Sequence, residues 1–170
     1  VGLSESNVFM RVIKLRMMSD KELKTSVKYE AEQYIPLPLD QVNLSFQRLD
    51  PDYLEKDKVN VQVVAAKKAT LDNQVQMLKK AGLVVKAIEP ETIALGRVLG
   101  DTQQNPMGTM ILELGYSESL VVVSYGGFVR FTRTVPIGGE SLTKSIQQAL
   151  GLEPDQAEEY KKAYGMDHLQ

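Results

Sequence analysis

A pair of adjacent glycines, Gly126 and Gly127, is the feature that most restricts how this chain folds. The pair lies between two strand-like segments, residues 120–123 and 129–135. Paired glycines adopt positive φ at little cost, and a two-residue hairpin turn needs that conformation. We therefore expect an antiparallel hairpin, which a third strand over residues 109–114 extends to a three-stranded meander.

Two helices are predicted after the meander, over residues 140–150 and 154–164. Apolar residues recur at helical spacing in the first of them. Pro154 suits the first turn of the second helix, where a missing N–H costs little. Gly151 and Gly165 are the expected ends of the two helices, because glycine readily takes the left-handed conformation found just after a helix.

The first hundred residues alternate strands and helices, which predicts a mixed α/β fold. Ser19 and Glu22 have the spacing of a capping box, and the helix that they start is expected to end before Pro36. Thr70 is the expected cap of a second helix, and a third helix follows Pro90. The expected strands are residues 8–15, 42–46, 59–66 and 84–88, and the charged run 50–58 is an expected loop.

Composition excludes several classes of function. A formal net charge of −2 over 170 residues argues against non-specific binding to nucleic acid. The chain has no cysteine, and its one histidine, His168, lies near the end, so neither a thiolate metal site nor a histidine-based catalytic group is expected. No apolar run approaches the roughly 20 residues that span a bilayer. The chain opens V-G-L-S-E-S-N-V-F without an initiator methionine or signal peptide, from which we expect an internal piece of a longer protein.

The turn between the first two strands of the meander has the composition of a phosphate-binding hairpin. A strand ends in Glu113, and Gly115, Ser117 and Ser119 follow it. Backbone amides at such a tip can wrap a phosphate, and an acid at the strand end can hold Mg²⁺ directly or through water. A plain hairpin turn explains the same residues and stays the alternative.

Four segments carry a resemblance to a known family. They are E-A-E-Q-Y-I-P-L-P-L-D-Q-V (30–42), I-L-E-L-G-Y-S-E-S (111–119), Y-G-G-F-V-R-F-T-R-T-V-P-I-G-G-E-S-L-T-K-S-I (125–146) and A-E-E-Y-K-K-A-Y-G (157–165). In order and spacing the chain resembles the PilM family, actin-like proteins of type IV pilus assembly, and more broadly FtsA, the actin-like cell-division protein. The Y-I-P-L-P-L part favours PilM.

The resemblance implies an actin-like (ribonuclease H-like) α/β fold that is incomplete in this chain. Residues 1–100 would form part of the first lobe, with a small inserted subdomain at about 17–86. Residues 107–170 would form the opening half of the second lobe. The polar stretch 101–106 is the expected boundary between the two lobes.

The resemblance also implies ATP with Mg²⁺ in the full-length protein, and no catalytic residue in this chain. It assigns cofactor contacts to Glu113, Gly115, Ser117, Ser119, Gly138, Gly139, Glu158 and Lys161, with Glu113 also as the metal ligand. For Glu158 and Lys161, a surface ion pair on one helical face stays the alternative.

Three residues of the predicted phosphate loop depart from the family pattern. Glu113 stands for the usual Asp, Tyr116 for a small residue, and Glu118 for a common Thr. An extra carboxylate repels a triphosphate unless Mg²⁺ lies between them. We therefore expect that this chain alone neither hydrolyses ATP nor binds it well, and that nucleotide is a structural ligand or switch in the full-length protein.

The partner that the resemblance implies is the short N-terminal tail of PilN, an inner-membrane protein. The tail would dock as an extended peptide beside the inserted subdomain, which requires an apolar groove. Candidate groove residues are Met10, Val12, Tyr34, Ile35, Leu37 and Leu39, for which simple core packing is the alternative.

The implied function is a cytoplasmic scaffold of type IV pilus assembly, which serves twitching motility or competence. Through its partners it would be peripheral at the inner membrane, in contact with the other platform proteins, and it is a candidate homo-oligomer. The alternatives are an FtsA-like division filament and an active ATPase of the actin superfamily. A membrane-tethered filament needs a C-terminal amphipathic helix, which G-M-D-H-L-Q is not, and the expected portion after Gln170 keeps this alternative open.

Overall fold

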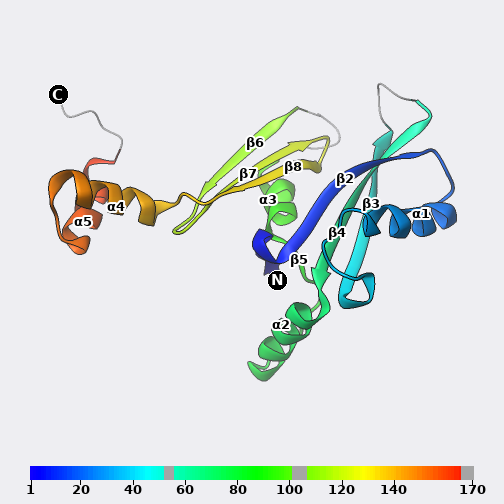
Figure 1. Cartoon of the computed structure of the whole chain (residues 1–170), viewed down its shortest axis with the longest axis horizontal. Helices are drawn as coiled ribbons and strands as arrows, with labels where there is room; N and C mark the ends of the chain where they lie inside the picture. Colours follow the sequence, from blue (N-terminus) through cyan, green and yellow to red (C-terminus); the bar gives the residue numbers. More distant parts are fainter. Residues whose placement is uncertain (52–55, 101–106, 166–170) are drawn as a thin grey trace. The chain divides into compact units, whose positions relative to one another are not determined.

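The computed structural model describes residues 1–51, 56–100 and 107–165, and it has a mixed α/β fold (Figure 1). The chain divides into two compact units. The first comprises Val1–Met110 and Val122–Thr132, and the second comprises Ile111–Val121 and Arg133–Gln170. The predicted lobe boundary at 101–106 lies outside the described residues, so the assignment of lobes stays a prediction.

An antiparallel sheet of three strands is the centre of the first unit. The strands are β2 (Val8–Arg16), β4 (Lys58–Lys67) and β3 (Val42–Pro51), in the order β2-β4-β3. The strands that were predicted over 8–15, 42–46 and 59–66 are confirmed. Strand β3 runs to Pro51, past the start of the predicted loop, and a register irregularity lies between Arg48 and Pro51.

Helix α1 (Asp20–Glu32) covers one face of this sheet. Leu23, Val27 and Ala31 recur at helical spacing and are buried against the strands. The sheet residues of this core are Ile13, Leu15, Val42, Val59, Val61, Val63 and Ala65. The predicted capping box is confirmed, because the Ser19 hydroxyl accepts from the Glu22 amide and the Glu22 carboxylate accepts from the Ser19 amide.

The end of the first unit departs from the predictions in two places. Helix α2 (Lys68–Lys80) begins before the predicted cap at Thr70. The predicted strand over 84–88 is wrong, because these residues form no strand, and the next paired residues along the chain are Glu89–Pro90 (β5), which pair in parallel with β1 (Gly2–Leu3). The apolar composition of 84–88 predicts a strand, but a strand forms only where a neighbouring strand supplies hydrogen-bond partners for its backbone.

A short carboxylate-centred cluster fixes the third helix, α3 (Glu91–Leu99), in the first unit. Glu5, in a 3-10 turn (Glu5–Asn7), accepts hydrogen bonds from the hydroxyls of Thr92 and Thr132. Its own amide donates to the Glu91 carboxylate over 2.8 Å. The helix that was predicted after Pro90 is confirmed.

The meander is confirmed as a sheet in the order β6-β7-β8. Its strands are β6 (Thr109–Leu114), β7 (Ser119–Tyr125) and β8 (Phe128–Val135). Gly126 and Gly127 have φ of 63° and 78°, as the hairpin turn between β7 and β8 requires. Helices α4 (Gly139–Leu150) and α5 (Pro154–Tyr164) follow, and Gly151 ends α4 in the left-handed conformation.

Candidate functional site: a hairpin docked on the first turn of a helix

The turn between β6 and β7 and the start of α4 are joined backbone to backbone in the second unit. The amide of Gly139 donates to the carbonyl oxygen of Gly115 over 2.9 Å, and the amide of Glu140 donates to that of Tyr116 over 2.9 Å. Within the turn, the Gly115 amide donates to the Glu118 carbonyl over 3.0 Å. Two of the amides that a helix leaves free at its N-terminus are therefore used by the protein itself.

Two glycines permit this close approach. A Cβ at Gly138 would overlap the carbonyl group of Tyr116 and would lie 2.7 Å from the amide nitrogen of Glu118. A Cβ at Gly115 would lie 2.6 Å from the carbonyl oxygen of Glu118. Both clashes are with backbone, which cannot rotate away as a side chain can. These glycines are therefore needed for the hairpin and the helix to pack, whatever binds beside them.

A polar cluster joins α5 to the first turn of α4. The Lys161 ammonium donates to the Gly139 carbonyl (3.0 Å), to the Thr143 hydroxyl (2.9 Å) and to Glu158 Oε2 (2.7 Å). The Thr143 hydroxyl lies 2.6 Å from Glu158 Oε2, and Thr143 is buried. Glu158 and Lys161, which were predicted to lie near one another, are an i,i+3 pair on one face of α5, as expected.

The ion pairs around this cluster shift the pKa values of two side chains. The hydrogen bonds from Lys161 and then Thr143 hold the pKa of the Glu158 carboxyl below its usual value. At the start of α4 the Glu140 carboxylate accepts from Lys144 over 2.8 Å and raises the pKa of that lysine. Each of these two acids therefore has a cation beside it: Lys161 lies beside Glu158, and Lys144 lies beside Glu140.

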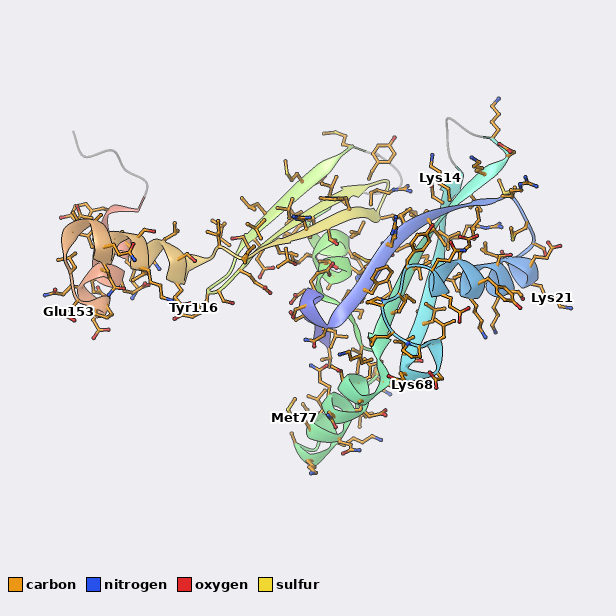
Figure 2. The ribbon with its side chains drawn as sticks, in the orientation of Figure 1. Lys14, Lys21, Lys68, Met77, Tyr116 and Glu153 are labelled. Atoms are coloured by element: carbon orange, nitrogen blue, oxygen red, sulfur yellow. The ribbon has the colours of Figure 1, made fainter. Side chains whose placement is uncertain are left out.

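A cavity of about 360 Å³ opens between α4 and α5 beside the hairpin. Tyr116, Glu140, Thr143 and Glu158 are among its lining residues. Figure 2 shows the Tyr116 side chain at the hairpin, and Tyr116 is 73% exposed. The cavity is in the size range of small-ligand sites.

The other predicted cofactor residues fall into two groups. Glu113 and Ser117 are exposed, at the end of β6 and at the turn. Ser119 is buried, and its hydroxyl donates to the carbonyl oxygen of Ile137, so it ties the start of β7 to the segment that precedes α4. The amides of Tyr116 and Ser117 have no acceptor among the described residues.

The structure places the predicted partner-binding residues in several different places rather than in one groove. Met10 and Val12 lie on the sheet face away from α1 and line a cavity of about 270 Å³. Ile35 is only 6% exposed and belongs to the core, and with Leu37 it lines a separate groove. Leu39 lines a third cavity, and the exposed Tyr34 stacks under the Arg11 guanidinium, 4.1 Å from its ring centre.

Thr143 was not predicted as a site residue, although it is the centre of the polar cluster. The residue lies one helical turn after Gly139, whose carbonyl it contacts, but its two charged partners come from α5, fifteen residues or more along the chain. Helical periodicity predicts which face of α4 carries Thr143, but it does not predict which residues of the neighbouring helix lie against that face. Across the residues that the structure describes, no group of three or more metal-ligating side chains is present.

None of the helices in the described part of the chain is both long enough and apolar enough to cross a membrane.

Solved structures with the same fold include a close match and more distant ones. One is a PilM–PilN type IV pilus biogenesis complex. The alignment covers 96% of this chain and 50% of the matched chain in the complex, at 28% identity and a TM-score of 0.76. The cytoplasmic domain of EpsL, an inner-membrane component of the type II secretion system of Vibrio cholerae, aligns with 85% of this chain and 52% of its own, at 17% identity and a TM-score of 0.56. The latter likeness concerns the fold alone.

Sequence comparisons point the same way. The cell division protein FtsA of Bacillus subtilis is 24% identical over 97% of this chain, which spans 38% of that relative. The chain thus covers about half or less of the length of these relatives, and its fold is part of an actin-like fold. A profile of type IV pilus assembly protein PilM matches residues 1–168. The chain therefore belongs to the PilM family of type IV pilus assembly proteins.

Proposed function

We propose that this chain is the peptide-binding part of an actin-like scaffold in type IV pilus assembly. The occupant would be the N-terminal tail of a PilN-like inner-membrane protein, as the relative solved as a PilM–PilN complex suggests. The tail would hold the scaffold at the cytoplasmic side of the inner membrane, among the other platform proteins.

The observation that carries this proposal is a groove of about 280 Å³ beside the start of β2. Its apolar lining residues include Val8, Phe9, Ile35, Leu37 and Ala65. Strand β2 is at the edge of its sheet within the described residues, so it offers backbone groups next to the groove. An extended peptide uses both features, because backbone pairing gives affinity and apolar pockets hold alternate side chains.

Two leucines allow a matched test of the groove. Leu37 lines it, whereas Leu39 lines a different cavity, and both pack partly buried against the same core. Leu37→Glu and Leu39→Glu therefore disturb the core in similar ways, but only the first puts a charge into the groove.

The measurement is fluorescence polarisation of a labelled synthetic PilN tail with the full-length protein. We expect micromolar or tighter binding for the wild type, at least about tenfold weaker binding for Leu37→Glu, and little change for Leu39→Glu. No binding by the wild type, or equal losses in both variants, would refute the groove.

We further propose that nucleotide binds the second unit of the full-length protein as a structural ligand or switch. The open amides of Tyr116 and Ser117, and the adjacent cavity of about 360 Å³, suit a phosphate and the group attached to it. Glu113, at the end of β6, would hold Mg²⁺, which commonly takes one carboxylate together with phosphate oxygens and water. The metal would offset repulsion between the triphosphate and the acids of the hairpin.

Calorimetry of the full-length protein with Mg-ATP tests this second proposal. We expect binding in the wild type that weakens when Mg²⁺ is omitted and in Glu113→Gln. A wild type that takes up no nucleotide, or binding that is indifferent to Mg²⁺, would rule out the site as described.

A further inference from the structure

The Lys161 ammonium has no donor to spare. It carries three N–H groups, and three acceptors surround it at hydrogen-bonding distance: the Gly139 carbonyl, the Thr143 hydroxyl and Glu158 Oε2. Each contact is 3.0 Å or shorter. Lysine side chains on a surface usually leave donors to water, so this saturation is a specific feature of the contact between α4 and α5.

Thr143 completes the cluster from the other helix. Its hydroxyl accepts from Lys161 and has one hydrogen to give, with Glu158 Oε2 at 2.6 Å and the Gly139 carbonyl at 3.0 Å as the two acceptors. The shorter contact, to a carboxylate, is the stronger one. The Thr143 hydroxyl therefore bridges both charged side chains of α5, because it accepts from Lys161 and donates to Glu158.

The cluster continues into the hairpin. Lys161 holds the carbonyl of Gly139, and the amide of the same residue donates to Gly115. One residue on, the Glu140 amide donates to Tyr116. A continuous set of hydrogen bonds thus runs from α5, through the first turn of α4, to the hairpin.

We propose that Thr143, Glu158 and Lys161 form a latch that holds α5 on the first turn of α4, and that a nucleotide which engages Glu158 or Lys161 opens it. The second half of this statement rests on the proposed nucleotide site. Glu158 and Thr143 line the cavity beside the hairpin, so a ligand there meets the latch directly.

Competition follows from the saturation of Lys161. A ribose hydroxyl or phosphate that accepts from this ammonium has to displace the Gly139 carbonyl, the Thr143 hydroxyl or the Glu158 carboxylate. The free energy needed to break the latch then reduces the net free energy gained on nucleotide binding. A protein with a weakened latch binds nucleotide more tightly, and its hairpin and α5 are less firmly joined before binding.

The test uses three substitutions in the full-length protein. Thr143→Val removes the hydroxyl and keeps the shape of the side chain, whereas Thr143→Ser keeps the hydroxyl. Ser145→Ala is the matched control, because Ser145 also donates to the carbonyl four residues earlier in α4, at 2.9 Å, but is exposed. Circular dichroism shows whether each variant folds.

The first readout is hydrogen exchange of the Gly139 and Glu140 amides without nucleotide. We expect roughly three- to tenfold faster exchange in Thr143→Val, and wild-type rates in Thr143→Ser and Ser145→Ala. Unchanged exchange in Thr143→Val overturns the latch, and equal acceleration in Ser145→Ala does so as well.

The second readout is the affinity for Mg-ATP. We expect Thr143→Val to bind roughly three- to tenfold more tightly, with Thr143→Ser close to the wild type. Weaker binding by Thr143→Val overturns the competition. If the wild type binds no nucleotide at all, the proposed nucleotide site and the opening of the latch both fail, and the exchange rates alone decide whether Thr143 holds the two helices together.

Discussion

The amide of Gly139 donates to the carbonyl oxygen of Gly115 over 2.9 Å, while the carbonyl of the same Gly139 accepts from Lys161 over 3.0 Å. One peptide position at the start of α4 therefore serves the hairpin on one side and α5 on the other. The glycine pair 138–139 is where the second unit is joined together. The first role of this pair is to let the backbone of the hairpin approach the backbone of α4.

Gly138→Ala should destabilise the protein by about 1–3 kcal/mol, because the new methyl group overlaps the Tyr116 carbonyl and neither backbone can rotate away. The backbone conformation itself, φ −140° and ψ −170°, suits alanine, so the cost is one of space. Urea denaturation measures it. Gly108→Ala is the control, since a Cβ there meets nothing within 4 Å. Equal stabilities of the two variants would contradict the close contact.

Glu158→Gln should destabilise the protein at neutral pH and progressively less as the pH falls. The pKa of Glu158 is lowered from 4.5 in the folded protein, so its contribution is complete above the unfolded value and is lost as pH falls through the lower folded value. Thermal midpoints of variant and wild type, from about pH 7 to about pH 3.5, should converge on acidification. A pH-independent difference would mean that charge is not involved.

Ser19→Ala should cost about 0.5–2 kcal/mol, because it removes the side-chain acceptor at the start of α1 and half of the capping box. Far-ultraviolet circular dichroism during urea unfolding reports the change. Thr25→Ala lies on the exposed side of the same helix and should be neutral or slightly stabilising. The capping role is wrong if the two variants behave alike.

Gln62→Leu should cost about 1–3 kcal/mol, because the Gln62 amide donates to the Val129 carbonyl over 2.8 Å in a buried place. Gln47 is its neighbour in register on β3 but is exposed, so Gln47→Leu is the matched control. Differential scanning calorimetry of both variants decides. A lower midpoint for Gln47→Leu than for Gln62→Leu would be the contrary result.

Local signals in the sequence predicted most of the elements. Gly126 and Gly127 specify their turn through backbone conformation alone, and the Ser19–Glu22 spacing specifies its cap through two hydrogen bonds within one helix. Neither depends on a distant part of the chain. These features are therefore readable from a few residues.

Features that need a distant partner were harder to predict. Residues 84–88 have the composition of a strand, but pairing depends on a neighbour that the segment itself does not encode. Ile35 was predicted to be a wall of the partner groove, with core packing as the alternative; it is buried in the core and also lines the groove beside β2. Thr143 gave no signal, because the two charged groups that it contacts are on another helix.

The contact of Gly138 with Tyr116 has a consequence for how relatives of this chain are compared. A relative that binds no nucleotide would still be selected to keep a glycine at this position, because a Cβ there would overlap the Tyr116 carbonyl and destabilise the contact between the hairpin and α4. The glycine motif therefore indicates a shared fold, and it does not indicate whether a relative binds the ligand. Whether a relative keeps the proposed nucleotide site is better judged at Glu113 and Ser117, whose side chains are exposed and are not needed for this packing.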